Sequence, residues 1–208
     1  PMLRLGIAFM LASMMNSGAE FLIRSYLNTR GSLETVGLFN AGITIVIIYA
    51  GMIFSVMESD YYPRLSAIRQ KGEELNTCVN RQLEMNIMLI GPIIIAMIIG
   101  LPIIIPLLYN TQFLGMLGMT QIAALGMLFK AMYLPIEYLP LSRGESKVFL
   151  AQESFCVVLL IVCEIVGYKI GETTGIGCLT GLGGGIVTAY IIEAAAVLAF
   201  SRWHYGYH

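Results

Sequence analysis

The sequence has little charge, since only 12% of its 208 residues are Asp, Glu, Lys or Arg. A soluble domain carries about 25% charged residues and needs them to cover its surface. The 12 basic and 13 acidic residues give a net charge of -1, so no basic excess is present that could hold a nucleic acid. These deficits exclude a water-soluble domain and a nucleic-acid-binding module.

Residue types that bind metals are also scarce. The four cysteines form no CxxC pair and have no histidine at a zinc-finger spacing, so we expect them to pack as small apolar side chains. The two histidines, His204 and His208, lie in a tail that also holds Trp203, Tyr205 and Tyr207. This composition favours a tail whose aromatic rings anchor it at the membrane interface. We expect no metal site and no cofactor.

Apolar residues, by contrast, are abundant: they make up 57% of the chain, and the mean hydropathy is +0.78. A helix needs about 20 mostly apolar residues to cross the hydrocarbon core of a bilayer. The apolar runs are continuous rather than alternating, which favours helices over the strands of a membrane barrel. The sequence therefore predicts an all-α, polytopic membrane bundle with six transmembrane helices, at residues 3–27, 36–57, 85–108, 117–139, 148–168 and 176–200.

No shift in composition marks a second domain, so residues 1–208 are interpreted as a single transmembrane domain. The longest connection, residues 58–84, holds four basic and five acidic residues. It is predicted to be a cytoplasmic amphipathic linker that opens as a helix at Pro63.

The placement of Lys and Arg indicates how the spans are oriented. Six spans put both ends of this segment on one side of the membrane, with eight basic residues on that side against three on the other. The eight are Arg4, Arg64, Arg69, Lys71, Arg81, Arg143, Lys147 and Arg202. By the positive-inside rule, both ends are expected to be cytoplasmic.

The first predicted span carries a row of polar side chains that fall within about 120° of one another around a helix. They are Ser13, Asn16, Ser17, Glu20, Arg24 and Asn28. Polar and ionisable groups are costly inside a membrane span, so the row has two interpretations. In the first, Glu20 and Arg24, which are four residues apart, form an ion pair that holds helices together. In the second, the whole row lines a hydrated cavity. The number of polar positions favours the cavity.

Ionisable residues also occur in the later spans. Lys130 lies about 13 Å inside the fourth predicted span, near the limit from which a lysine can reach water. Glu137 is two turns further along on nearly the same face. Lys130 therefore has two possible roles: a structural ion pair with Glu137, or a functional charge. Three further acidic residues lie in the last two spans: Glu153, Glu164 and Glu193. They could relay protons or bind a cation, or they could simply contact water at the ends of the spans.

Gly177, Gly181 and Gly185 recur every four residues in the last predicted span. Small residues at this spacing let two helix backbones approach closely in lipid. No GK[ST] sequence follows that would indicate a phosphate-binding loop. We therefore expect close helix packing at these glycines.

Three runs carry a resemblance to a known family: VGLFNA at residues 36–41, YPRLS at 62–66 and LSRGESKVF at 141–149. They resemble the polysaccharide biosynthesis flippases of the MOP exporter superfamily, which have two six-helix lobes. The chain is similar to the second, C-terminal lobe alone, and it begins with Pro1 rather than Met. The resemblance thus implies one lobe of a two-lobe transporter, whose partner is the N-terminal lobe of the same protein.

The function that this resemblance implies is the flipping of polyprenyl-pyrophosphate-linked oligosaccharide across the bacterial inner membrane, for surface polysaccharides such as lipopolysaccharide. Arg24 and Lys130 would supply positive charge for the pyrophosphate, and Ser13, Asn16 and Ser17 would hydrogen-bond the sugars. Such transport breaks no covalent bond, so no catalytic residue is expected and the protein is not an enzyme.

Ion gradients drive some members of this family between inward- and outward-facing states. Glu20, Glu137 and Glu164 are therefore the candidates for binding a coupling ion.

Two alternatives stay open. A MATE-like drug or cation exporter would use acidic cavity residues such as Glu20 and Glu164 rather than Arg24 and Lys130. A polytopic membrane transferase would need a cluster of His, Asp or Arg at a membrane face, whereas this chain has two histidines in its tail and a single Asp.

Overall fold

The computed structural model describes residues 2–68 and 72–207, with side chains from residue 6 onward. The described residues are helical almost throughout and contain no strand. The helices are α1 (Met2–Arg30), α2 (Leu33–Ala67), α3 (Glu73–Leu108), the 3-10 helix η1 (Thr111–Met116), α4 (Leu117–Glu137), α5 (Leu139–Ser142), α6 (Ser146–Thr174) and α7 (Cys178–Tyr205). Six stretches are long and apolar enough to cross a membrane, with η1, α4 and α5 forming one of them. The prediction of an all-α bundle with six transmembrane helices is confirmed.

The helices extend beyond the predicted spans, most of all around residues 58–84. α2 runs on to Ala67 with Pro63 inside it, so this proline does not open a separate helix as predicted. A salt bridge of 2.6 Å between Arg64 Nη2 and Asp60 Oδ2 spans the turn that holds Pro63. α3 then begins at Glu73. The predicted linker thus consists largely of the ends of two long helices.

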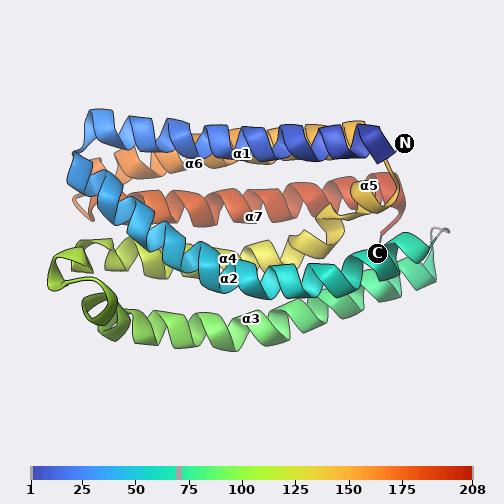
Figure 1. Cartoon of the computed structure of the whole chain (residues 1–208), viewed down its shortest axis with the longest axis horizontal. Coiled ribbons are helices and arrows are strands. Elements are labelled where there is room, and N and C mark those ends of the chain that lie inside the picture. Colours follow the sequence, from blue (N-terminus) through green and yellow to red (C-terminus); the bar gives the residue numbers. More distant parts are fainter. Residues whose placement is uncertain (1, 69–71, 208) are drawn as a thin grey trace.

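α7 lies in the middle of the bundle, packed against α6 and α4 (Figure 1). α1 packs along α6, and α3 packs along the other side of α4. α2 starts beside the end of α1 and crosses the bundle diagonally toward α3, so that α1 and α2 diverge from a shared end (Figure 1). This divergence leaves the faces of α4, α6 and α7 that lie behind them without a continuous cover.

Both chain ends lie at one end of the bundle (Figure 1). The basic residues that the helix order places toward that end are Arg64, Arg81, Arg143, Lys147 and Arg202. Arg24, Arg30 and Lys169 lie toward the other end. The side chain of Arg4, and residues Arg69 and Lys71, fall outside the described residues. The cytoplasmic location of the end with both termini stays a prediction.

The aromatic tail differs from the prediction. Trp203 is 83% exposed, as an interfacial anchor would be, whereas Tyr205 and Tyr207 are buried. The Tyr205 hydroxyl donates to Glu145 Oε2 at 2.6 Å, and the Tyr207 hydroxyl donates to Asn80 Oδ1. The prediction was wrong for these two tyrosines because their hydroxyls donate to side chains of other segments, which a buried tyrosine needs.

α3 and α4 donate side-chain hydrogen bonds to backbone carbonyls of each other at two prolines. A proline inside a helix has no N–H, so the carbonyl four residues earlier loses its helical donor. Pro135 deprives the carbonyl of Ala131 in this way, and Asn86 Nδ2 of α3 donates to it at 3.4 Å. Pro102 deprives the carbonyl of Ile98, and Gln121 Nε2 of α4 donates to it at 2.9 Å. Each helix therefore supplies the donor that the other one lacks.

We expect Asn86→Leu to destabilise the protein by at least about 1 kcal/mol, because it leaves the carbonyl of Ala131 unsatisfied and removes the acceptor of Gln82 Nε2. In a Pro135→Ala background the helix regains its own donor at this position, so the same substitution should cost less. The free energy of unfolding of the four proteins in a double-mutant cycle measures this coupling. An equal cost in both backgrounds would show that Asn86 does not replace the bond lost at Pro135.

The glycines of α7 pack directly on the backbone of α6. A Cβ built at Gly185 would overlap the carbonyl oxygen of Cys163 and lie 3.1 Å from the Cα of Glu164. A Cβ at Gly181 would likewise overlap the backbone of Gly167 and Gly171. The predicted close packing is confirmed at Gly181 and Gly185, with glycines on both helices at the contact. Gly177 lies before α7 at a φ of 107°, and a Cβ there would come no closer than 3.6 Å to another side chain.

Candidate functional site

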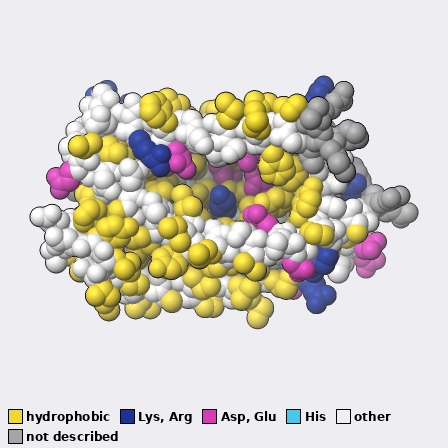
Figure 2. All heavy atoms as spheres, viewed as in Figure 1, with side chains coloured by type: hydrophobic (Ala, Val, Ile, Leu, Met, Phe, Trp, Pro, Cys, Tyr) yellow, Lys and Arg dark blue, Asp and Glu magenta, His cyan; other side chains and the backbone are white. Residues whose placement is uncertain are grey.

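A cavity of about 400 Å³ lies between α1, α2, α4, α6 and α7. Figure 2 shows the face on which α1 and α2 diverge, with a hollow at its centre that holds basic and acidic side chains amid apolar ones. We call this space the main cavity. A smaller one of about 230 Å³, the side cavity, adjoins it, because Asn16, Lys130, Leu160 and Tyr190 line both. The two cavities thus form one polar region inside an apolar bundle.

Lys130 occupies the wall that the two cavities share. Its Nζ atom lies 5.6 Å from the centre of the Tyr190 ring, a distance at which the ring face attracts a cation. Among the described residues, no carboxylate forms a salt bridge with Lys130. The structural ion pair with Glu137 that the spacing suggested is therefore not formed. The ammonium group is held by an aromatic ring and faces the cavity.

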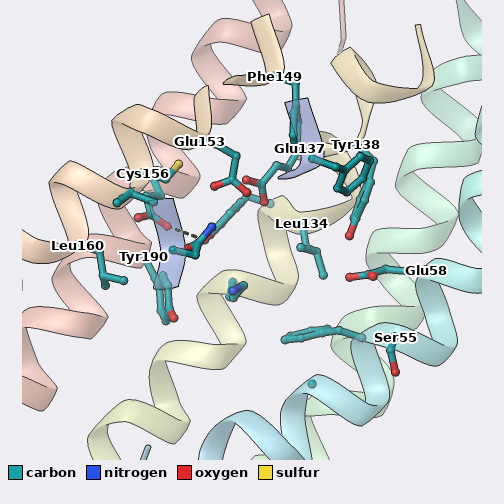
Figure 3. Close-up of a pocket in the computed structure, with 18 residues that line it drawn as sticks. Ser55, Glu58, Leu134, Glu137, Tyr138, Phe149, Glu153, Cys156, Leu160 and Tyr190 are labelled. Atoms are coloured by element: carbon teal, nitrogen blue, oxygen red, sulfur yellow. Dashed lines mark hydrogen bonds between the residues drawn. The ribbon is translucent and has the colours of Figure 1, made fainter. Parts of the chain in front are cut away.

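Four carboxylates surround the main cavity, each from a different helix. Glu137 of α4 and Glu153 of α6 point toward each other, and Glu58 of α2 faces them from the opposite wall (Figure 3). Glu193 of α7 is 2% exposed and accepts a hydrogen bond of 2.5 Å from the Tyr133 hydroxyl. Acidic groups therefore outnumber Lys130, the one basic residue among the described residues that line this cavity.

Glu58, like Tyr133 and Tyr190, is a cavity residue that the sequence did not indicate. It lies just past the predicted end of the second span and was counted as part of the polar linker. Because α2 continues beyond it without a break, Glu58 instead faces the cavity one turn after Ser55. The only available signal was the spacing of Glu58 from Gly51, Phe54 and Ser55, which places these residues on one helix face.

The polar row on α1 lies on an exposed face of the bundle. Arg24 Nη2 forms a salt bridge of 2.9 Å with Glu20 Oε2, and Arg24 Nε donates to Asn40 Oδ1 of α2 at 2.8 Å. The pair therefore exists, as the first interpretation expected. Both residues also line the side cavity, as the second expected. Arg24 joins α1 to α2 at the end where the two helices meet.

The other residues of the row divide into two groups. Asn16 lines both cavities, and its Nδ2 donates to the carbonyl of Ala12 at 3.1 Å. Ser13, Ser17 and Asn28 are exposed and line neither cavity. The structure thus brings Asn16 together with Lys130 but leaves the two serines on the outer surface of α1.

Glu164 of α6 is 6% exposed and lines the side cavity opposite Glu20 and Arg24. No described residue gives it a hydrogen bond or a salt bridge. The three candidates for a coupling ion are accordingly separated, with Glu137 in the main cavity and Glu20 and Glu164 in the side cavity.

Within the part of the chain that the structure describes, no three His, Cys, Asp or Glu residues are grouped so as to hold a metal ion. All four cysteines are free thiols, and Cys156 packs in the wall of the main cavity. His208 lies outside the described residues. The chemistry that these residues offer is the binding of a charged or hydroxyl-rich molecule.

Comparison with known families finds a match over more than half of the chain. A family model described as "Polysaccharide biosynthesis protein" matches residues 1–118, which include α1, α2, α3 and η1. The matched segment holds Asn16, Glu20 and Arg24, and it ends before Lys130. No curated protein and no solved structure matches the chain.

Proposed function

The chain belongs to the polysaccharide biosynthesis protein family, and we propose that within this family it flips a polyprenyl-pyrophosphate-linked oligosaccharide across the bacterial inner membrane. A role in polysaccharide synthesis or export and a multi-pass membrane location follow from the family and the six apolar helices. The cargo and the flipping step are the proposal.

The observation that carries this proposal is a cavity with a free lysine ammonium inside a membrane bundle. A pyrophosphate is anionic and its glycan is hydrophilic, so neither crosses hydrocarbon without a polar path. Lys130 offers the anion a charge that no carboxylate of the described residues neutralises by direct contact. Electrostatic interactions are screened less in such a cavity than in bulk water, so this charge attracts phosphate strongly. Asn16 and the cavity tyrosines offer hydrogen bonds to sugar hydroxyls.

A second six-helix lobe forms the other wall of this path. Glu20 and Arg24 have side chains 53% and 44% exposed although they lie inside a membrane span. Such groups are costly to expose to lipid, so a protein surface or water is the expected environment for this face. An N-terminal lobe packed against α1 and α2 would enclose the hollow and complete the cavity.

Glu20, Glu137 and Glu164 are the proposed sites of ion coupling. A carboxylate that takes up a proton or a cation changes the charge of the cavity, and this change can favour one access state over the other. Glu164 is the strongest of the three candidates, because it is buried and makes no ion pair within the described residues.

The proposed function is tested by reconstituting the intact protein in liposomes that contain the lipid-linked oligosaccharide. We expect all of the glycan to become accessible to a membrane-impermeant glycosidase, because flipping exchanges the two leaflets. In liposomes without the protein, only the outer-leaflet share should be cleaved. If the protein leaves the inner-leaflet share protected, it does not flip this lipid.

One observation favours a second function. The main cavity holds four carboxylates against a single lysine among the residues described, a balance that suits an organic cation better than an anion. A MATE-like cation exporter is therefore the alternative. The same liposomes, loaded with a fluorescent organic cation under an imposed proton or sodium gradient, distinguish the two. Cation transport without lipid flipping would favour the exporter.

A further inference from the structure

A groove of about 500 Å³ lies between α6 and α7, at the end of the bundle that holds both termini. Six apolar residues line it: Val148, Ala151, Phe155, Ala196, Val197 and Phe200. Its two polar lining residues are Lys147 and Gln152, and none of the described lining residues is acidic. The groove shares no lining residue with the main or side cavity.

The groove opens on the outer surface of the bundle. Lys147, Ala151 and Phe155 are exposed and follow one another at intervals of one turn along α6. The same face continues with Val158 and Val162, which are 59% and 51% exposed. Such an apolar face on a spanning helix meets acyl chains. Lys147 therefore stands where this lipid-facing surface reaches the membrane boundary.

The polar groups of the groove are donors that lack acceptors. Lys147 forms no salt bridge with a described residue, and the nearby Glu145 is in contact with Tyr205 and His204. The Nε2 atom of Gln152 is buried and has no hydrogen-bond partner among the described residues. A buried donor without an acceptor costs free energy. Gln152 lines the groove, and rotation of its side chain toward the groove would let Nε2 donate to an oxygen of a ligand there.

We propose that this groove binds an anionic glycerophospholipid of the leaflet facing that end of the bundle. Three positions along α6 match the three parts of such a lipid. Lys147 at the boundary contacts the phosphate, Gln152 about 8 Å deeper donates to an ester carbonyl, and Phe155 with Phe200 packs on an acyl chain. Arg202, exposed in the last turn of α7, adds positive charge at the same end. The site is independent of the proposed transport function.

Native mass spectrometry of the intact protein, with dioleoyl-phosphatidylglycerol or dioleoyl-phosphatidylcholine added in detergent, tests this proposal. We expect phosphatidylglycerol to be retained in preference. Lys147→Gln should lower that preference about fivefold, the contribution of one basic residue near a charged headgroup. Ala151→Trp should reduce the retention of both lipids, because the indole fills the groove.

Lys169→Gln is the matched control, since Lys169 is exposed on the same helix at the opposite end and lines none of the cavities described. It should leave the preference unchanged. An unaltered preference in Lys147→Gln, or an equal loss in Lys169→Gln, would overturn the proposal. So would a dimer that Ala151→Trp dissociates, because the groove would then hold a second copy of the chain.

Discussion

Replacing Lys130 with Met is expected to abolish export of the surface polysaccharide while the protein stays at its normal level in the membrane. Met preserves the length and the apolar stem of the side chain and removes only the charge. Because Lys130 makes no salt bridge to a described carboxylate, its removal leaves no partner unpaired. A charge-assisted hydrogen bond contributes about 1.5–3 kcal/mol, so affinity for the pyrophosphate should fall about 10- to 100-fold.

The experiment compares Lys130→Met with Lys130→Arg in the intact protein and scores membrane abundance together with surface polysaccharide. Arg keeps the charge in a bulkier, planar group, so partial export is expected. Lys169→Met is the control for loss of a lysine outside the cavities. Normal export in Lys130→Met would remove this residue from the mechanism and leave Arg24 as the remaining basic candidate. Loss of the protein from the membrane would instead assign Lys130 a structural role.

The second large effect is expected at the contact between α6 and α7. Gly185→Ala should destabilise the protein by about 3 kcal/mol, because the new Cβ overlaps backbone atoms of α6 that cannot move as a side chain can. Gly184, its neighbour in α7, has no atom within 4 Å of the position that a Cβ would take. Gly184→Ala should therefore be neutral or slightly stabilising, since alanine favours the helix over glycine.

Thermal unfolding of the two purified variants provides the comparison. Because they differ by one position in the same helix, any general effect of replacing glycine is common to both. If both variants unfold at the same temperature, close backbone contact at Gly185 contributes nothing to stability. A lower unfolding temperature for Gly185→Ala alone would confirm that α6 and α7 are held together at this point.

The sequence predicts well those features that depend on local composition. The six spans follow from continuous apolar runs, and the packing at Gly181 and Gly185 follows from a four-residue spacing that needs no knowledge of the partner. The end of α2 could not be predicted in this way, because Pro63 and a charged stretch both suggest a break. The Asp60–Arg64 salt bridge spans that turn within a continuous helix, and Glu58 lies in the cavity as a result.

The residues of the site likewise divide into those that a local pattern predicts and those that depend on contacts between helices. The row on α1 was visible as a helical pattern, and the structure places Asn16, Glu20 and Arg24 of this row along the cavities. The grouping of Glu137 with Glu153, and of Glu193 with Tyr133, depends on how α4, α6 and α7 meet. No spacing within one helix encodes a contact of this kind. Tyr205 and Tyr207 were misplaced for the same reason, since their acceptors come from distant segments.

The exchange of donors between α3 and α4 has a consequence for how related chains diverge. The Asn86 side chain satisfies the carbonyl of Ala131 only because Pro135 leaves it open, and Gln121 does the same for Ile98 because of Pro102. Asn86 Oδ1 has a further role, since it accepts from Gln82 Nε2 at 3.0 Å. Selection should therefore act on each amide together with the proline it compensates. Among homologues, we expect positions 86 and 135 to covary, and positions 121 and 102 to covary. Where Pro102 is lost, position 121 becomes free to drift to an apolar residue, whereas Asn86 is still needed as the acceptor for Gln82.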